Sequence, residues 1–160
     1  MSMEDLSSVL WRERELLETL LYKLEVEQMV LAGGRTHWLA TAAREIEVVL
    51  EQVRNIELLR AVELDVVAAE LGLDPSPGLH EIADRSPEPW KTIWLDHREA
   101  FTTVAAEIQK MSVHNRELLT AGYHAAQATL LSMTESAGTY DAGGSVATAD
   151  RRHSLLDRSL

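Results

Sequence analysis

The sequence predicts an all-α protein, in which an antiparallel helical hairpin and a third, longer C-terminal helix form a coiled-coil-like three-helix bundle with a flexible tail. Two observations lead to this fold class. Hydrophobic residues make up 46% of the 160 residues but aromatic residues only 5%, so the core must consist mainly of Leu, Val, Ile and Ala, which suit helix bundles. In addition, apolar residues recur at seven-residue spacing in separate stretches of the chain.

The first predicted helix begins near Ser2 and ends at Gly33-Gly34. Its apolar row repeats every seven residues, at Leu10, Leu17, Leu24 and Leu31. Two consecutive glycines are a common helix stop, because glycine adopts the left-handed conformation that closes a helix. The acidic residues of this segment, Glu13 among them, alternate with Arg and Lys and are expected on a solvated face.

The second predicted helix runs from about Thr36 to Gly72. Leu39, Ile46 and Val53 mark its apolar row. Each of these two helices has one apolar stripe to cover, and the connection between them is short. Antiparallel pairing of the two helices is therefore expected.

All four prolines lie between residues 73 and 89, which marks a connector with one short helical turn around Ile82. The third helix is expected to begin with Ser86 as its N-cap and to reach about Thr134. Because it is longer than the first helix, its far end is expected to extend past its partners. Residues 1–137 are thus predicted to form a helical domain, and residues 138–160 a disordered tail.

Charge and composition exclude several classes of function. The formal net charge is -11 and no cluster of Lys and Arg with interleaved aromatic residues occurs, so no nucleic-acid binding is expected. No window approaches the length of apolar chain that spans a bilayer, so no membrane insertion is expected. The absence of cysteine and of a signal-peptide pattern indicates a cytoplasmic protein.

No motif for catalysis or metal binding is found. The six histidines never stand three or four residues apart and no Glu-x-x-His occurs, so neither a metal nor a cofactor is expected, and the histidines are interpreted as partly exposed or capping. A phosphate-binding glycine loop and a nucleophile elbow are also absent. An enzyme is therefore the weakest hypothesis.

The second half of the third helix offers candidate partner-binding residues. Small residues such as Gly122 and Ala126 permit close approach of another helix, and larger apolar residues on either side supply anchors. The alternative is that this stretch is simply more core. The candidates are Leu118, Leu119, Gly122, Tyr123, Ala126, Leu130, Leu131 and Met133.

Asn115 is a further candidate, because it occupies a position of the third helix where an apolar side chain is expected. A polar residue in a helix seam often determines register at a cost in stability. Alternatively, Asn115 marks the point where the bundle ends and the partner-binding stretch begins. The sequence leaves both interpretations open.

The whole chain, over about residues 6–144, resembles the FlgN-type flagellar export chaperones. The resemblance rests on the segments LWRERELLETLLYKLEVEQMVLAGG, EIEVVLEQVRNIELLRAVELDVVAAELGL, HNRELLTAGYHAAQATLLSM and GTYDAGG. It implies a non-enzymatic cytoplasmic chaperone that captures hook-filament junction (hook-associated) proteins, prevents their premature assembly and delivers them to the flagellar export gate.

The resemblance also implies that the last helix binds substrate, through a hydrophobic row of Leu118, Leu119, Tyr123, Leu130 and Leu131. Tyr123 is alternatively a contact for the export gate, as similar tyrosines are in the family. A different class remains open: the seven-residue repeats would equally suit self-association, in a structural coiled-coil adaptor or a homo-oligomeric scaffold.

Overall fold

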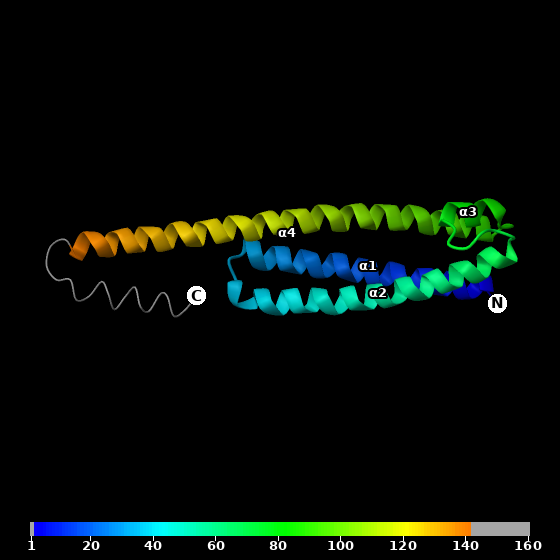
Figure 1. The fold of residues 1–160 in the computed structure, drawn as a ribbon, viewed down its shortest axis with the longest axis horizontal. Helices are drawn as coiled ribbons and strands as arrows, with labels where there is room; N and C mark the ends of the chain where they lie inside the picture. Colours follow the sequence, from blue (N-terminus) through cyan, green and yellow to red (C-terminus); the bar gives the residue numbers. More distant parts are fainter. Residues whose placement is uncertain (1, 142–160) are drawn as a thin grey trace. The chain divides into compact units, whose positions relative to one another are not determined.

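The computed structural model describes residues 2–141, which contain four α-helices and a short 3₁₀ helix (Figure 1). No strand occurs in this part of the chain, so the predicted all-α class is confirmed. The chain divides into two units with the boundary between Leu118 and Leu119, and each is described by itself. The elements are α1 (Ser2–Ala32), η1 (Thr36–Trp38), α2 (Leu39–Glu70), α3 (Leu79–Arg85) and α4 (Trp90–Asp141).

The helix α1 ends where the two glycines predict. Gly34 has a φ of 66°, and the amide of Arg35 donates to the carbonyl of Val30 at 3.1 Å. This is the Schellman arrangement, which satisfies carbonyls that a helix end leaves without a partner. The same arrangement ends α2, where Gly72 has a φ of 70° and the amide of Leu73 donates to the carbonyl of Ala68 at 2.9 Å.

In the first unit, α1 and α2 lie side by side and run antiparallel (Figure 1). The polar contacts show this direction, because residues nearer the N-terminus of α1 contact residues nearer the C-terminus of α2. Lys23 pairs with Glu45 at 3.1 Å, and Glu13 pairs with Arg60 at 2.8 Å. Ser2 donates a hydrogen bond to Glu70 at the far end.

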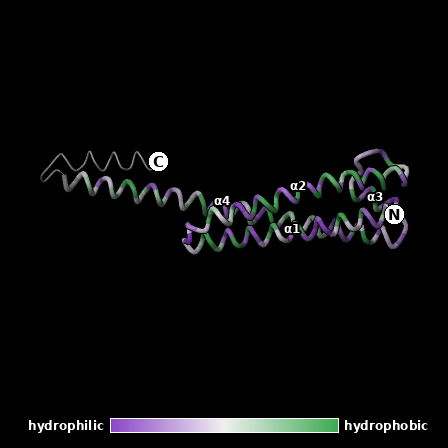
Figure 2. Tube along the Cα trace, turned by 90° about the horizontal axis from the view of Figure 1, so that it is seen from below, coloured by the Kyte–Doolittle hydropathy of each residue, from purple (hydrophilic) through white to green (hydrophobic). Residues whose placement is uncertain are grey.

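Two apolar clusters form the core of the first unit. One lies in the middle of α1 and α2, where partly buried residues of α4 pack against it; its buried members are Leu20, Leu24, Ile46, Val49 and Val53. The other joins all four helices at the N-terminal end of α1; its buried members are Leu6, Leu10, Val67, Ala68, Ile82, Ala83 and Trp94. Figure 2 shows polar and apolar residues alternating along these helices, as amphipathic helices require.

The prediction that Ser86 caps the start of the third helix is wrong. Ser86 follows the last residue of α3, and its buried hydroxyl donates to the carbonyl of Ile82 at 2.7 Å and accepts from Trp94 Nε1 at 3.0 Å. The start of α4 has Glu88 instead, whose carboxylate accepts from the amide of Thr92 at 3.3 Å. Tertiary contact with a buried tryptophan thus outweighed a local capping preference.

The far end of α4 lies beyond the expected limit near Thr134, because this helix continues to Asp141. Residues 138–141, which the sequence placed in the tail, are therefore helical. The remaining part of the predicted tail, residues 142–160, lies outside the described residues.

Candidate partner-binding surfaces

Asn115 lies in the contact between α4 and α1 of the first unit. Its side chain is only 2% exposed, and its Nδ2 donates to the backbone carbonyl of Leu24 at 2.9 Å and to Glu27 Oε1 at 3.0 Å. Its Oδ1 has no hydrogen-bond partner. Of the two interpretations of Asn115, this geometry favours a polar residue within a helix seam.

In the second unit, one face of α4 carries a row of exposed apolar side chains. Residues three and four apart on a helix lie on the same face, since about 3.6 residues make one turn. The candidates Leu119, Gly122, Tyr123, Ala126, Leu130 and Met133 follow this spacing, and all of them are exposed. We call this set the exposed apolar face.

The exposed apolar face combines large and small residues. Tyr123 is 62% exposed and Met133 65%, so both present most of their surface to solvent. A Cβ added to Gly122 would meet no atom of the described residues within 4 Å, so a methyl group would fit at this position. A partner helix that packs here would find a shallow region at Gly122 and Ala126, with larger side chains on either side.

Two sequence candidates lie beside this face. Leu131 is 65% exposed, but it follows Leu130 by one residue and is therefore rotated by about 100° around the helix. Leu118 is partly exposed and is the last residue of the first unit. The hydroxyl of Tyr123 accepts a hydrogen bond from Gln127 Nε2 at 3.0 Å, within the same helix.

Sequence reasoning missed a buried ion pair in the first unit. Glu13 was expected on a solvated face, and this is wrong: its side chain is 2% exposed, and Oε1 accepts from Arg60 at 2.8 Å. Burial raises the pKa of Glu13, Arg60 opposes this and Glu57 adds to it. The sequence did indicate this burial. Glu13 lies three residues after Leu10 and four before Leu17, so it shares the apolar stripe of these two leucines.

His97 is a second buried titratable residue, contrary to the expectation of partly exposed or capping histidines. Its ring is fully buried and lies among Trp11, Trp94 and Phe101, with ring centroids 5.0, 6.5 and 6.1 Å away. Burial lowers the pKa of His97, Arg14 lowers it further and Asp96 opposes them. The sequence carried a signal that was not used, since His97 lies seven residues after Trp90 and seven before Val104, at the spacing of an apolar row.

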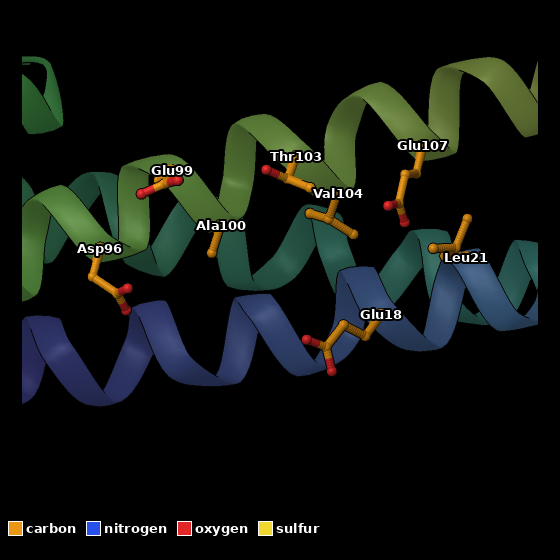
Figure 3. A pocket seen from close by; sticks show the side chains of 8 residues that line it. All are labelled: Glu18, Leu21, Asp96, Glu99, Ala100, Thr103, Val104 and Glu107. Atoms are coloured by element: carbon orange, nitrogen blue, oxygen red, sulfur yellow. The ribbon is translucent and has the colours of Figure 1, made fainter.

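A groove with a volume of about 430 Å³ lies between α1 and α4 of the first unit. Figure 3 shows Glu18 and Leu21 on α1 facing Asp96, Val104 and Glu107 on α4. A second hollow shares Leu21 and Glu107 and continues the groove toward Met111. Apolar side chains thus lie between carboxylates along one side of the first unit.

The described residues carry no cluster of His, Cys, Asp and Glu able to hold a metal ion. Within residues 2–141, none of the helices combines the length and the apolar character that crossing a membrane requires. The fold and the exposed apolar face define an all-helical protein with an apolar helix surface open to solvent.

Comparison with known families identifies this class more closely. Residues 1–148 match the family described as FlgN protein, and the chain belongs to this family. This match confirms the resemblance noted in the sequence. FlgN proteins are flagellar export chaperones and not enzymes. The comparisons with curated proteins and with solved structures found no match.

Proposed function

We propose that this chain is a cytoplasmic chaperone that binds hook-filament junction proteins, prevents their premature assembly and delivers them to the flagellar export gate. The observation that carries the proposal is the exposed apolar face of α4, in a chain that belongs to a family of export chaperones. In this proposal the antiparallel α1 and α2 with the first part of α4 form a bundle-like scaffold. The second unit supplies the contact with the partner.

The exposed apolar face suits a partner segment that is unfolded before assembly. Leu119 and Leu130 are 41% exposed, and Tyr123 and Met133 more than 60%, so a partner that covers these four side chains buries apolar surface, which favours the ordering of such a segment. Gly122 and Ala126 would let the partner backbone approach α4 closely. Because no covalent bond is made or broken on binding, release at the export gate needs only a competitor for the same surface.

The remaining candidates have separate roles in this proposal. Leu118 and Leu131 flank the exposed apolar face and extend the contact of a partner that wraps around α4. Asn115 holds α4 against α1 through its hydrogen bond to the carbonyl of Leu24. Tyr123 contacts either the junction protein or the export gate, since 62% of its surface is exposed.

The test is binding of purified junction proteins to the full chain, measured by titration calorimetry. The double variant Leu119→Asp, Leu130→Asp places two charges on the exposed apolar face and should abolish binding. The matched control Leu58→Asp, Val62→Asp places the same charges on exposed apolar residues of α2 and should bind as the wild type does. Equal affinities for all three proteins would disprove the proposed surface.

One observation favours a second function, that of a self-associating scaffold. Leu58, Val62 and Val66 follow one another at four-residue spacing along α2 and are 70%, 58% and 43% exposed. Such a row suits pairing between copies of the chain. A sedimentation coefficient that rises with concentration, and that no longer does so in the Leu58→Asp, Val62→Asp variant, would support the scaffold over the chaperone.

A further inference from the structure

The groove between α1 and α4 carries an unusual combination of charge and apolar surface. Leu21, Val104 and Met111 are only partly buried along it, so each leaves apolar surface accessible. Exposed carboxylates lie beside Leu21 and Val104 in this groove (Figure 3). These carboxylates belong to Glu18, Asp96, Glu99 and Glu107.

Most of these carboxylates have no cationic partner. Asp96 pairs with Arg14 at 3.2 Å and Lys110 lines the second hollow, but Glu18, Glu99 and Glu107 form no ion pair within the described part of the chain. Like charges around one hollow repel one another, and solvent screens this repulsion because the carboxylates are exposed. The groove therefore presents negative charge beside apolar surface, and this combination attracts cationic side chains that also carry apolar neighbours.

We propose that this groove binds one amphipathic helix of a partner protein, whose apolar row is flanked by Lys or Arg. The apolar row would cover Leu21, Val104 and Met111, and the basic side chains would pair with Glu18, Glu99 and Glu107. This surface lies entirely in the first unit and is separate from the exposed apolar face. It does not depend on the function proposed above.

The dimensions of the groove fit a helix. The two hollows extend along α4 from Asp96 to His114, which at 1.5 Å per residue is about 27 Å, the length of a helix of about 18 residues. A helix in this position would contact α1 and α4 as a further member of the bundle does. Its apolar row at three- and four-residue spacing would face the groove while its flanking cations reach the carboxylates.

Charge also distinguishes this occupant from other ones. A second copy of the chain carries a net charge of -11 and would bring further negative charge to the groove. A phosphate backbone is repelled for the same reason. A basic amphipathic helix is the occupant that neutralises the groove and covers its apolar part at once.

The test uses a fluorescein-labelled synthetic peptide of about 18 residues, with leucines at helical three- and four-residue spacing and lysines on both flanks. A second peptide has glutamate in place of each lysine. Binding to the full chain is followed by fluorescence anisotropy. We expect the lysine peptide to bind, the glutamate peptide not to bind, and the affinity of the first to fall as salt increases.

The protein variants then locate the site. Glu18→Lys with Glu99→Lys reverses two charges of the groove and should weaken the lysine peptide by about tenfold or more. Glu47→Lys with Glu117→Lys reverses two exposed carboxylates outside it, with the same change in net charge, and should weaken binding far less. Circular dichroism of each variant checks that the helical fold is retained.

Three results would overturn the proposal. One is failure of the lysine peptide to bind the wild type, and another is an equal loss in the groove and control variants, which would indicate attraction by net charge alone. The third is loss of binding in Leu119→Asp, Leu130→Asp with no loss in the groove variant. That result would place the peptide on the exposed apolar face and leave the chaperone proposal intact.

Discussion

The side-chain amide of Asn115 donates a hydrogen bond to the backbone carbonyl of Leu24, 2.9 Å away, and so joins α4 to α1 inside the first unit. The same nitrogen donates to Glu27, while the side-chain oxygen of Asn115 stays buried without a partner. A buried amide that satisfies only part of its hydrogen-bonding capacity costs stability, yet it restricts how two helices can slide along each other.

Substitution of Asn115 by alanine should lower the free energy of unfolding by about 1–3 kcal/mol, because two hydrogen bonds are lost in a buried position. Urea unfolding followed by circular dichroism measures this change. The control is Asn55→Ala, an exposed asparagine of α2, which should change stability by less than about 0.5 kcal/mol. An equal effect of both substitutions would show that the contact with Leu24 does not stabilise the first unit.

The Arg60→Ala variant should be less stable than the wild type by about 2–3 kcal/mol at neutral pH, because Glu13 remains buried without its cation. The pKa of Glu13 is already raised by burial, and loss of Arg60 raises it further. A raised carboxyl pKa means that the folded state gains stability as pH falls through that value. The difference from the wild type should therefore shrink as the pH is lowered through the raised pKa of Glu13.

The matched control for Arg60 is Arg54→Ala. Arg54 pairs with Glu51 at 3.1 Å, but both side chains are about two-thirds exposed. Such pairs contribute less than about 1 kcal/mol. If the two arginine variants lose the same stability and show the same pH dependence, the burial of Glu13 has no energetic consequence.

The contribution of His97 to stability should decrease as pH falls below 6.5, the ordinary pKa of histidine, because burial and Arg14 hold the pKa of His97 lower than this in the folded state. The unfolded chain then takes up a proton that the folded chain does not, which favours unfolding. His97→Leu removes this contribution and should flatten the pH dependence below 6.5 in thermal unfolding. His114→Leu, at an exposed position of α4, leaves His97 in place and should keep the wild-type slope.

Gly122→Ala should stabilise the helix of the second unit by about 0.5–1 kcal/mol, since glycine is unfavourable inside a helix and the added Cβ meets no atom within 4 Å. Amide hydrogen exchange of residues 119–133 measures this. If a partner approaches α4 closely, the added methyl group should weaken junction-protein binding despite the more stable helix. Gly138→Ala, which lies off the exposed apolar face, should stabilise α4 without changing affinity.

Local signals predicted the helices well. The stop at Gly33-Gly34 and the end of α2 at Gly72 depend on backbone conformations that glycine adopts without strain, so neighbouring residues alone determine them. The short helix around Ile82 likewise follows from local spacing between prolines. The start of α4 was less predictable, because Ser86 bonds to Trp94 and that contact needs α3 and α4 to be already in place.

The two candidate surfaces also differ in whether the sequence alone could predict them. The exposed apolar face could be read from the sequence because its members lie within one helix, and helical spacing alone places them together. The groove could not, because Glu18 and Glu99 lie on different helices and only the packing of α1 against α4 brings them to one hollow.

The sequence by itself determined the all-helical fold, most helix ends and the spacing of the apolar rows, because these depend on interactions between residues close together in the chain. Only the tertiary structure decided that Glu13, His97 and Asn115 are buried. A stripe on a helix is broad enough to include polar residues, and whether one of them is covered depends on the neighbouring helix, which its own sequence does not specify.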